Sequence, residues 1–412
     1  MKRKIATVII ASLLISSCNS INNRKNGELL TTFYVASDIH LLSNNLIDSD
    51  NQTYKKSNLT SDGRIQECDY TLVETLIHKV NQNKPKFLIL TGDLTFNGEY
   101  NSHTELVRLL HNVNDDTKVL VLPGNHDINN IYSRSFKNDT IKSVDNISYE
   151  SFKNLYSDFG YGDALSVASD TLSYAYAIDD NTIGVFLDTT LSEYNAEFET
   201  NFVGGWLYED TLAWLEGVLS KAKEDGKQVI SFTHHNLFDH SSVFHDKYTI
   251  DNADELANLY NKYGVKLNFS GHLHIQNIAE NNGIYDVASG SLLDTANLYG
   301  VVNIYKKAIE YDAYSVDEST AEYAFNIFKQ KYHDKTLTKN KEQYGDDADK
   351  LSYLLGDINA YYFGGNYKMV NQIIKEHQED IDRIKNNETT SKYVLSMLEL
   401  EDKNQLHLRI ER

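Results

Sequence analysis

The sequence contains 412 residues, with 39 Lys and Arg against 59 Asp and Glu, and its formal net charge is −20 at pH 7. This acidic balance provides no positive field for a phosphate backbone, which argues against a protein that binds long nucleic acids. Two cysteines cannot form a disulfide scaffold in a chain of this length, and a hydrophobic content of 41% argues against global disorder. The length predicts a main domain with a smaller second one.

The N-terminal residues have the pattern of an export signal. Basic residues at 2–4 precede an apolar run at 5–15, which is too short to span a bilayer as a helix. The run ends in Ile15-Ser16-Ser17-Cys18, which resembles the lipobox of bacterial lipoproteins. The resemblance implies a signal peptide at 1–17, a tether at 18–28 and an exported protein that lipidated Cys18 anchors to the membrane of the bacterial cell envelope. The alternative is an ordinary secretory signal that happens to contain a cysteine.

From residue 29 to residue 311 the sequence alternates short β-rich runs with amphipathic stretches, which indicates an α/β domain. Strands are predicted at 32–36, 87–90, 119–122, 229–232 and 265–269, and helices at 69–81, 102–111, 151–159, 208–224 and 253–263. Further β patterns at 172–178, 182–187, 284–288 and 301–305 predict a second sheet or antiparallel edges.

The last hundred residues change character, and apolar side chains recur there at helical spacing. Gly364 and Gly365 separate two such runs as a helix stop and turn. We therefore expect a small all-α domain at 312–412. The apolar positions are Leu351, Leu354, Leu355, Ile358, Tyr362, Val370, Ile373, Ile374, Ile381 and Ile384.

The predicted strands that begin at residues 32, 87, 119, 229 and 265 are each followed by residues that can bind metal or move protons. Because the carboxyl ends of parallel strands meet at one edge of a sheet, we expect five loops to deliver these side chains to one place. The residues are Asp38 and His40, then Asp93, then Asn125, His126 and Asp127, then His234, and finally His272 and His274.

The spacing of these residues suits a metal site. Asp38 and His40 are two positions apart, as are His272 and His274, so each pair can face one side of an extended segment. Glycine precedes several of them and lets the backbone turn closely around an ion. Carboxylate, imidazole and amide groups together suit Mn, Fe or Zn, and one central Asp can bridge two ions.

The complete set of D-x-H, G-D, G-N-H-D, H and G-H-x-H motifs resembles the calcineurin-like metallophosphoesterase superfamily. The resemblance implies an α/β fold in which helices flank a β-sandwich (αββα), with a catalytic domain at 29–311. It implies two divalent or mixed-valence transition-metal ions. One would be held by Asp38, His40 and His274, the other by Asn125, His234 and His272, and Asp93 would bridge them.

The superfamily resemblance also implies a reaction, in which a metal-bridging hydroxide attacks a small phosphoester substrate. His126 is expected to protonate the leaving oxygen, and Asp127 either orients His126 or its loop, or caps the loop structurally. Arg64 is either a phosphate-binding residue or a solvated turn residue.

The segment from Gly205-Trp206-Leu207 to His234-His235 is similar to the branch with cyclic-nucleotide and glycerophosphodiester phosphodiesterases. We therefore expect a phosphodiesterase acting on small diesters such as cyclic nucleotides. The alternatives are a phosphomonoesterase for nucleotides or lipid headgroups, and a surface lipoprotein that binds a partner through its helical domain.

Overall fold

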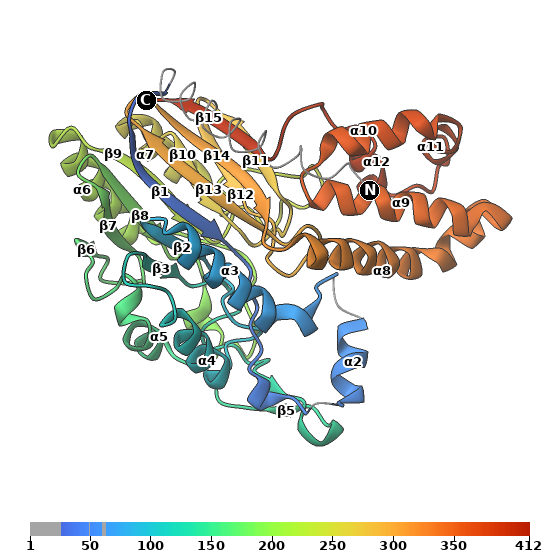
Figure 1. Ribbon diagram of the computed structural model, residues 1–412, viewed down its shortest axis with the longest axis horizontal. Coiled ribbons are helices and arrows are strands. Elements are labelled where there is room, and N and C mark those ends of the chain that lie inside the picture. The colour runs from blue at the N-terminus through green and yellow to red at the C-terminus, as the bar shows by residue number, and fades with distance from the viewer. Residues whose placement is uncertain (1–25, 49, 60–62) are drawn as a thin grey trace, which may run out of the picture.

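The computed structural model describes residues 26–48, 50–59 and 63–412. Two β-sheets face each other and helices cover their outer faces, with a helical extension to one side (Figure 1). The predicted αββα fold class is confirmed. The expected signal peptide, the lipidation site at Cys18 and most of the tether lie outside the described residues, and no helix of the described part is long and apolar enough to cross a membrane.

The first sheet has the order β15-β14-β13-β1-β2-β3. Strands β1 (Leu29–Ala36), β2 (Phe87–Thr91) and β3 (Lys118–Leu122) run parallel. Strands β13 (Leu298–Tyr305), β14 (Ala308–Ser315) and β15 (His407–Glu411) extend the sheet in antiparallel fashion beyond β1. The three parallel strands are nearly continuous apolar runs because both of their faces are covered.

The second sheet has the order β11-β12-β10-β9-β8-β7-β6. Its centre is parallel and consists of β8 (Thr182–Leu187), β9 (Gln228–Thr233), β10 (Leu267–Ser270) and β12 (Ile284–Ala288). Its edges are antiparallel and consist of β11 (Asn277–Asn281), β7 (Tyr174–Asp179) and β6 (Ser166–Val167). A separate small ribbon pairs β4 (Arg134–Ser135) with β5 (Lys142–Ser143).

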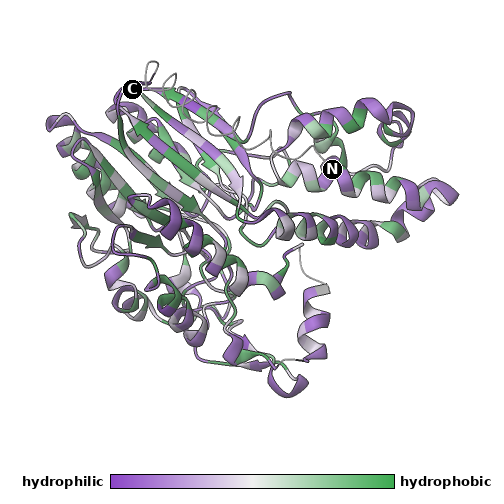
Figure 2. Cartoon of the chain, viewed as in Figure 1, coloured by the Kyte–Doolittle hydropathy of each residue, from purple (hydrophilic) through white to green (hydrophobic). Residues whose placement is uncertain are grey.

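Aromatic side chains join the two sheets at the centre of the molecule. The ring of Phe33 on β1 lies 5.8 Å from that of Phe232 on β9 and 5.8 Å from that of Phe269 on β10. On the outer faces, apolar sides of the helices pack onto the strands, whereas their solvent sides are hydrophilic (Figure 2). The covering helices are α3 (Asp69–Asn83), α4 (Tyr100–Leu110), α5 (Tyr149–Leu155), α6 (Glu209–Glu224) and α7 (Ala253–Tyr263).

The helical extension contains α8 (Glu318–Tyr344), α9 (Ala348–Phe363), α10 (Tyr367–Glu376), α11 (Gln378–Lys385) and α12 (Lys392–Met397). A further helix, α2 (Gln52–Leu59), lies in the segment that follows β1. The expected boundary at residue 312 falls inside β14, and the chain does not stay helical after it. It returns to the first sheet as β15, because the open edge of β14 offers backbone groups that must be paired.

Candidate metal centre

The sandwich brings the loops with the sequence motifs to the same end of the molecule. The loops after β1, β2 and β3 leave the first sheet, whereas those after β9 and β10 leave the second. The expectation that all five loops lie at one edge of a single sheet therefore needs correction. The parallel strands lie on one side of the first sheet and at the centre of the second, and the two facing sheets present the carboxyl ends of these strands side by side, with the candidate site between them.

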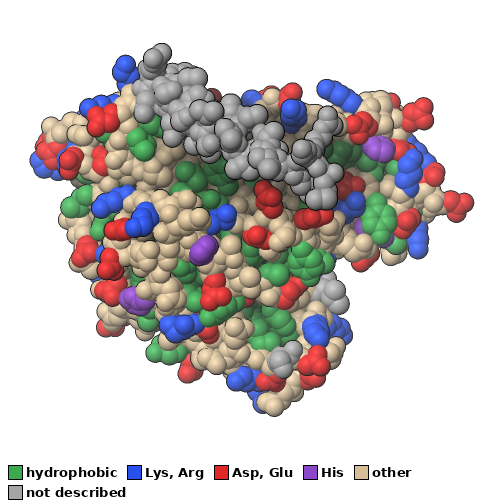
Figure 3. Space-filling model, in the orientation of Figure 1, with side chains coloured by type: hydrophobic (Ala, Val, Ile, Leu, Met, Phe, Trp, Pro, Cys, Tyr) green, Lys and Arg blue, Asp and Glu red, His purple; other side chains and the backbone are tan. Residues whose placement is uncertain are grey.

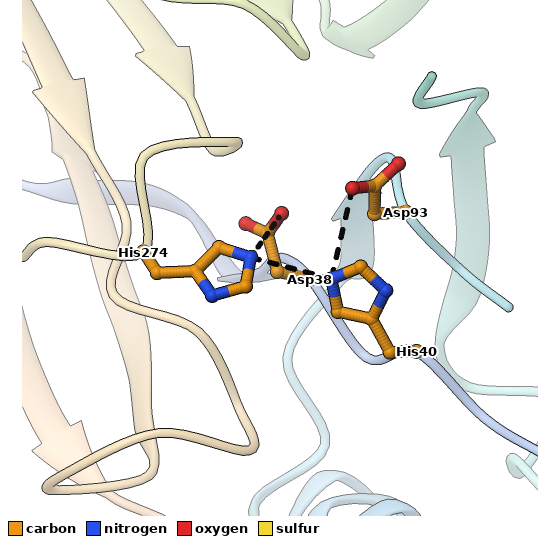
Figure 4. Close-up of side chains that lie close together, drawn as sticks. All are labelled: Asp38, His40, Asp93 and His274. Atoms are coloured by element: carbon orange, nitrogen blue, oxygen red, sulfur yellow. Dashed lines mark hydrogen bonds and ion pairs between the residues drawn. The ribbon is translucent and has the colours of Figure 1, made fainter. Parts of the chain in front are cut away.

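The first cluster of side chains consists of Asp38, His40, Asp93 and His274 (Figure 4). Nε2 of His274 lies 3.3 Å from Oδ1 of Asp38 and 3.2 Å from Nε2 of His40. Nε2 of His40 in turn lies 3.6 Å from Oδ2 of Asp93. One potential ligand atom from each of the four residues lies within 4.8 Å of the others, which is close enough for all of them to contact one ion.

The second cluster consists of Asp93, His234 and His272, and its potential ligand atoms also lie within 4.8 Å of one another. Nε2 of His234 is 3.3 Å from Oδ1 of Asp93 and 3.1 Å from Oδ1 of Asn125, which adds an amide oxygen to this group. Asp93 belongs to both clusters through its two carboxylate oxygens. The structure thus places all seven expected metal ligands together in the expected two groups.

Hydrogen bonds outside the clusters fix which nitrogen of three histidines faces the site. Nδ1 of His234 donates to the carbonyl oxygen of Thr91 at 2.9 Å, and Nε2 of His272 donates to that of Lys247 at 3.0 Å. Nδ1 of His274 donates to the Asp294 carboxylate at 2.6 Å. Because the donating nitrogen carries the proton, the other nitrogen of each neutral ring has a free lone pair for a metal.

The electrostatics of the clusters favour a bound cation. Burial lowers the pKa of His234, but the Asp93 and Asp38 charges and the hydrogen bonds to Asp93 and Thr91 together outweigh burial and raise this pKa to about 9. Burial also opposes protonation of His274, yet the Asp38 charge and the Asp294 hydrogen bond raise its pKa well above the usual value. Protons on these rings balance the buried carboxylates of Asp38 and Asp93, and a divalent cation can take their place. The donor set therefore fits a transition-metal centre.

The backbone at the clusters is held in an unusual conformation. Asp38, His40, Asp93, His272 and His274 all have positive φ, at 53°, 45°, 48°, 67° and 62°. Residues other than glycine rarely adopt this left-handed region, and such strain gathers at functional sites. Tight packing maintains it, since a Cβ on Gly271 would lie 1.9 Å from Oγ of Ser37 and 2.7 Å from Oδ2 of Asp38.

His126 and Asp127, the two expected catalytic residues, lie in different surroundings. The His126 side chain is 28% exposed, and its Nε2 lies 4.0 Å from Oδ2 of Asp93 at the edge of the first cluster. The Asp127 carboxylate accepts hydrogen bonds from the backbone N–H groups of Gly124, Leu94 and Thr95, and from the Thr95 hydroxyl. Its position is that of a structural cap that ties the loop after β3 to the loop after β2.

The ring of His126 is oriented by a group other than Asp127. Its Nδ1 lies 2.9 Å from the carbonyl oxygen of Phe96, to which it donates. Burial, partly opposed by the Asp93 charge, lowers the pKa of His126, so the ring gives up a proton readily. The geometry leaves Nε2 of His126 as the atom that can exchange a proton with a molecule bound at the clusters.

Several residues near the clusters carry no sequence motif. Asp294, which orients His274, lies in the loop after β12, and Lys247 contributes only its backbone carbonyl. The only sequence signal for Asp294 is its position just after a predicted strand. Arg64 is half-buried, its guanidinium carbon lies 6.0 Å from the Phe96 ring centroid, and its charge adds to burial in lowering the pKa of His40. It therefore lies beside the site and is not a fully solvated turn residue.

Comparison with known proteins agrees with this geometry. The sequence profile of the calcineurin-like phosphoesterase family matches residues 31–276, which is more than half of the chain. The chain belongs to the calcineurin-like phosphoesterase family. The matched segment contains every residue of the two clusters, and it ends two residues after His274.

Individual relatives of this phosphoesterase are distant. A protein of Vesicomyosocius okutanii named "Probable cyclic nucleotide phosphodiesterase" is 25% identical over 222 residues, which cover 52% of this chain and 76% of the relative. A protein of the same name from Ruthia magnifica matches to the same extent. A dimetal phosphatase from Danio rerio has a similar fold, with a TM-score of 0.51 at 15% identity over 71% of this chain and 98% of that protein.

Proposed function

We propose that this calcineurin-like phosphoesterase is a metal-dependent phosphodiesterase that hydrolyses small phosphodiesters such as cyclic nucleotides. The observation that carries the proposal is the pair of ligand clusters that share the Asp93 carboxylate. Two transition-metal ions, Mn, Fe or Zn, would be held there by the seven ligands, with Asp93 between them. When bound, such ions supply Lewis-acid chemistry, because they activate water and neutralise charge on phosphoryl oxygens.

The chain's own residues support the other parts of the reaction. Phe96 holds the His126 ring through its carbonyl oxygen, so that Nε2 faces the cluster and, in the protonated ring, can deliver its proton to the departing oxygen of the ester. Thr91, Lys247 and Asp294 accept hydrogen bonds from the outward nitrogens of three histidines, so the other nitrogen of each ring points its lone pair at the metal site once a cation replaces the proton there. Arg64 adds a fixed positive charge beside His40 and His126, which favours an anionic substrate.

The preference for a diester rests on the relatives and on the sequence of one segment. Distant relatives are named probable cyclic nucleotide phosphodiesterases, and the Gly205-Trp206-Leu207 segment is similar to the branch that contains such enzymes. The small size of the expected substrate agrees with the acidic composition, because 39 Lys and Arg against 59 Asp and Glu give no overall positive charge to attract a polymeric phosphate backbone.

The test is a substrate comparison on protein reconstituted with Mn²⁺. We expect bis(p-nitrophenyl) phosphate and 3′,5′-cyclic AMP to be hydrolysed faster than p-nitrophenyl phosphate, and chelation by EDTA to abolish all activity. The Asp93→Asn variant should lose activity by more than roughly 100-fold, since it weakens both clusters at once. Preference for the monoester would favour a phosphomonoesterase, and no hydrolysis with metal bound would favour a partner-binding lipoprotein.

We also propose that the protein is exported and anchored to the cell envelope through lipidated Cys18. The support is the sequence of residues 1–18. Metabolic labelling with an alkynyl fatty acid should tag the wild-type protein and leave a Cys18→Ser variant unlabelled. Equal labelling of both proteins, or secretion of an unlabelled wild type, would favour an ordinary secretory signal.

A further inference from the structure

The loop that carries His272 and His274 also contributes side chains to the hydrophobic core of the helical extension. Leu273 and Ile275 alternate with the two histidines and are 5% and 0% exposed. They belong to the hydrophobic core of the helical extension and not to the core between the sheets. Their neighbours in that core include four side chains of α9, namely Leu351, Leu354, Leu355 and Ile358. One short segment therefore presents ligands to the metal centre and apolar anchors to the helices.

Hydrogen bonds from the C-terminal part of the chain fix the backbone just after His274. The N–H of Gln276 donates to the carbonyl oxygen of Phe363, at the end of α9, at 2.8 Å. Nδ2 of Asn277 donates to the hydroxyl of Tyr367 on α10 at 2.7 Å. Gln405, just before β15, accepts from the Gln276 side chain and from the Ile278 N–H, at 2.9 and 2.7 Å. Gln276, Asn277, Tyr367 and Gln405 are buried, so the loss of these hydrogen bonds would leave unpaired donors and acceptors.

The helical extension also supports the group that orients His272. The carbonyl oxygen of Lys247 accepts the His272 hydrogen bond, and the adjacent Tyr248 ring lies 5.2 Å from the His272 ring. Tyr248 and nearby Phe244 pack against the core of the helical extension, where the Phe244 ring lies 5.1 Å from that of Tyr393 on α12. Both the position and the tautomer of His272 thus depend on contacts with the C-terminal helices.

We propose that the C-terminal helical extension (residues 318–397) positions His272 and His274 for metal binding, so that bound metal and the packing of α9 stabilise each other. The inference rests on the proposed metal-dependent function. In this proposal the extension contributes to the metal centre itself. Coupling between two sites is reciprocal. If the packing of α9 strengthens metal binding, bound metal must in turn stabilise the packing of α9.

The first experiment measures Mn²⁺ binding by calorimetry on chelator-treated full-length protein. Leu355→Ala on α9 removes a side chain that is 2% exposed and belongs to the same hydrophobic core as Leu273 and Ile275. Leu219→Ala on α6 is the matched control, because Leu219 is 1% exposed but lies in the separate core beneath the second sheet. We expect Leu355→Ala to weaken Mn²⁺ binding by about tenfold or more. The Mn²⁺ affinity of Leu219→Ala should stay within about twofold of that of wild type. Leu355→Met keeps the volume of the side chain, so its Mn²⁺ affinity should be close to that of wild type.

The second experiment needs no variant and therefore does not depend on a mutant that folds. Hydrogen exchange on the wild-type protein should slow in α9 and at residues 276–278 when Mn²⁺ is added. Unchanged exchange in α9, or equal Mn²⁺ affinities in wild type and Leu355→Ala, would overturn this inference alone. A wild-type protein that binds no Mn²⁺ would overturn the metal-dependent function as well.

Discussion

At the scale of single residues, Asp93 is buried, belongs to both ligand clusters and has a strained backbone conformation. Its carboxylate lies between His40 and His234, its Oδ1 accepts the backbone N–H of His126 at 2.9 Å, and its φ is 48°. Burial alone would raise its pKa, but the charges of His234 and His126 outweigh burial and hold the pKa well below the usual range. Asp93 therefore stays ionised in a buried position, as a shared ligand of two cations requires.

His126 permits a prediction about the leaving group. Replacing it in His126→Ala should lower kcat for cyclic AMP, whose leaving group is a poor alkoxide, by about 100-fold or more, because the departing oxygen then lacks its proton donor. The rate with bis(p-nitrophenyl) phosphate should fall much less, since p-nitrophenolate leaves without a proton. Steady-state kinetics with metal analysis tests this, with exposed His245→Ala as the control. An equal loss on both substrates would contradict the assignment.

Glu99 permits a prediction about stability and pH. Burial raises its pKa from 4.5 to about 7, although hydrogen bonds to its carboxylate oppose the rise. The folded state therefore binds this proton more tightly than the unfolded state. The resulting stability is complete below about pH 4.5 and is lost as pH rises to about 7.

The Glu99→Gln variant lacks this titration. Between about pH 5 and pH 8, the free energy of unfolding of wild type should fall by roughly 2–3 kcal/mol relative to the variant. Urea unfolding at both pH values measures the difference, and exposed Glu197→Gln should follow wild type. A constant difference between wild type and Glu99→Gln would show that Glu99 does not titrate in this range.

At the scale of elements, the site is a set of tight turns between strands and helices. The parallel strands β1, β2, β3, β9 and β10 are largely buried, and each places its ligands in the loop that follows it. Positive φ angles at five ligands turn these side chains inward, and the close approach of Gly271 to Ser37 and Asp38 joins the two sheets there. The turns therefore set the direction of the ligand side chains, and the C-terminal helices support the turn that carries His272 and His274.

A pair of glycine substitutions tests this view. Gly271→Ala forces a Cβ within 1.9 Å of Oγ of Ser37, so we expect stability to fall by roughly 2–3 kcal/mol and Mn²⁺ affinity to fall with it. Gly217→Ala on α6 meets nothing within 4 Å and should stabilise the protein by roughly 0.5–1 kcal/mol. Thermal unfolding and Mn²⁺ titration of both variants measure the contrast. Similar effects at the two positions would contradict it.

At the scale of the whole molecule, the C-terminal residues close the fold on its first sheet. Strand β15 pairs with β14 and covers its edge. Arg412 then reaches across, donating to the Tyr305 carbonyl of the first sheet at 2.9 Å and to the Thr182 hydroxyl of the second at 3.3 Å. On the face shown in Figure 3, acidic and basic side chains are interspersed.

Removal of residues 406–412 tests how much β15 contributes to the stability of the fold. The deletion exposes the edge of β14 and removes the five residue pairs of the β14–β15 ladder, so we expect a loss of roughly 3–5 kcal/mol and a tendency to aggregate. Arg412→Ala should cost much less, because it leaves the ladder intact. Denaturant unfolding and light scattering provide the measurements. Equal stability of the truncated and full chains would show that β15 does not hold the sheet.

The sequence by itself determined the local parts of this protein. Most predicted strands and helices of the catalytic region are found within a few residues of their expected bounds, because hydrophobic period and turn residues act over short distances. The types of ligand residue could also be predicted from short motifs, since each motif closely follows its own strand. One expected helix, at 151–159, is divided into α5 and a short 3-10 helix at Ser157–Phe159.

Only the tertiary structure decided how these parts meet. Pairing of β15 with β14, the contact of Asp294 with His274, and the packing of Leu273 and Ile275 into the helical extension carry no sequence motif. They depend on which distant segments come together, and that choice is set by the burial of apolar faces and the pairing of buried backbone groups over the whole chain. For the same reason, the sequence predicted the C-terminal helices as a separate domain and gave no sign that they share a hydrophobic core with Leu273 and Ile275 of the loop that carries His272 and His274.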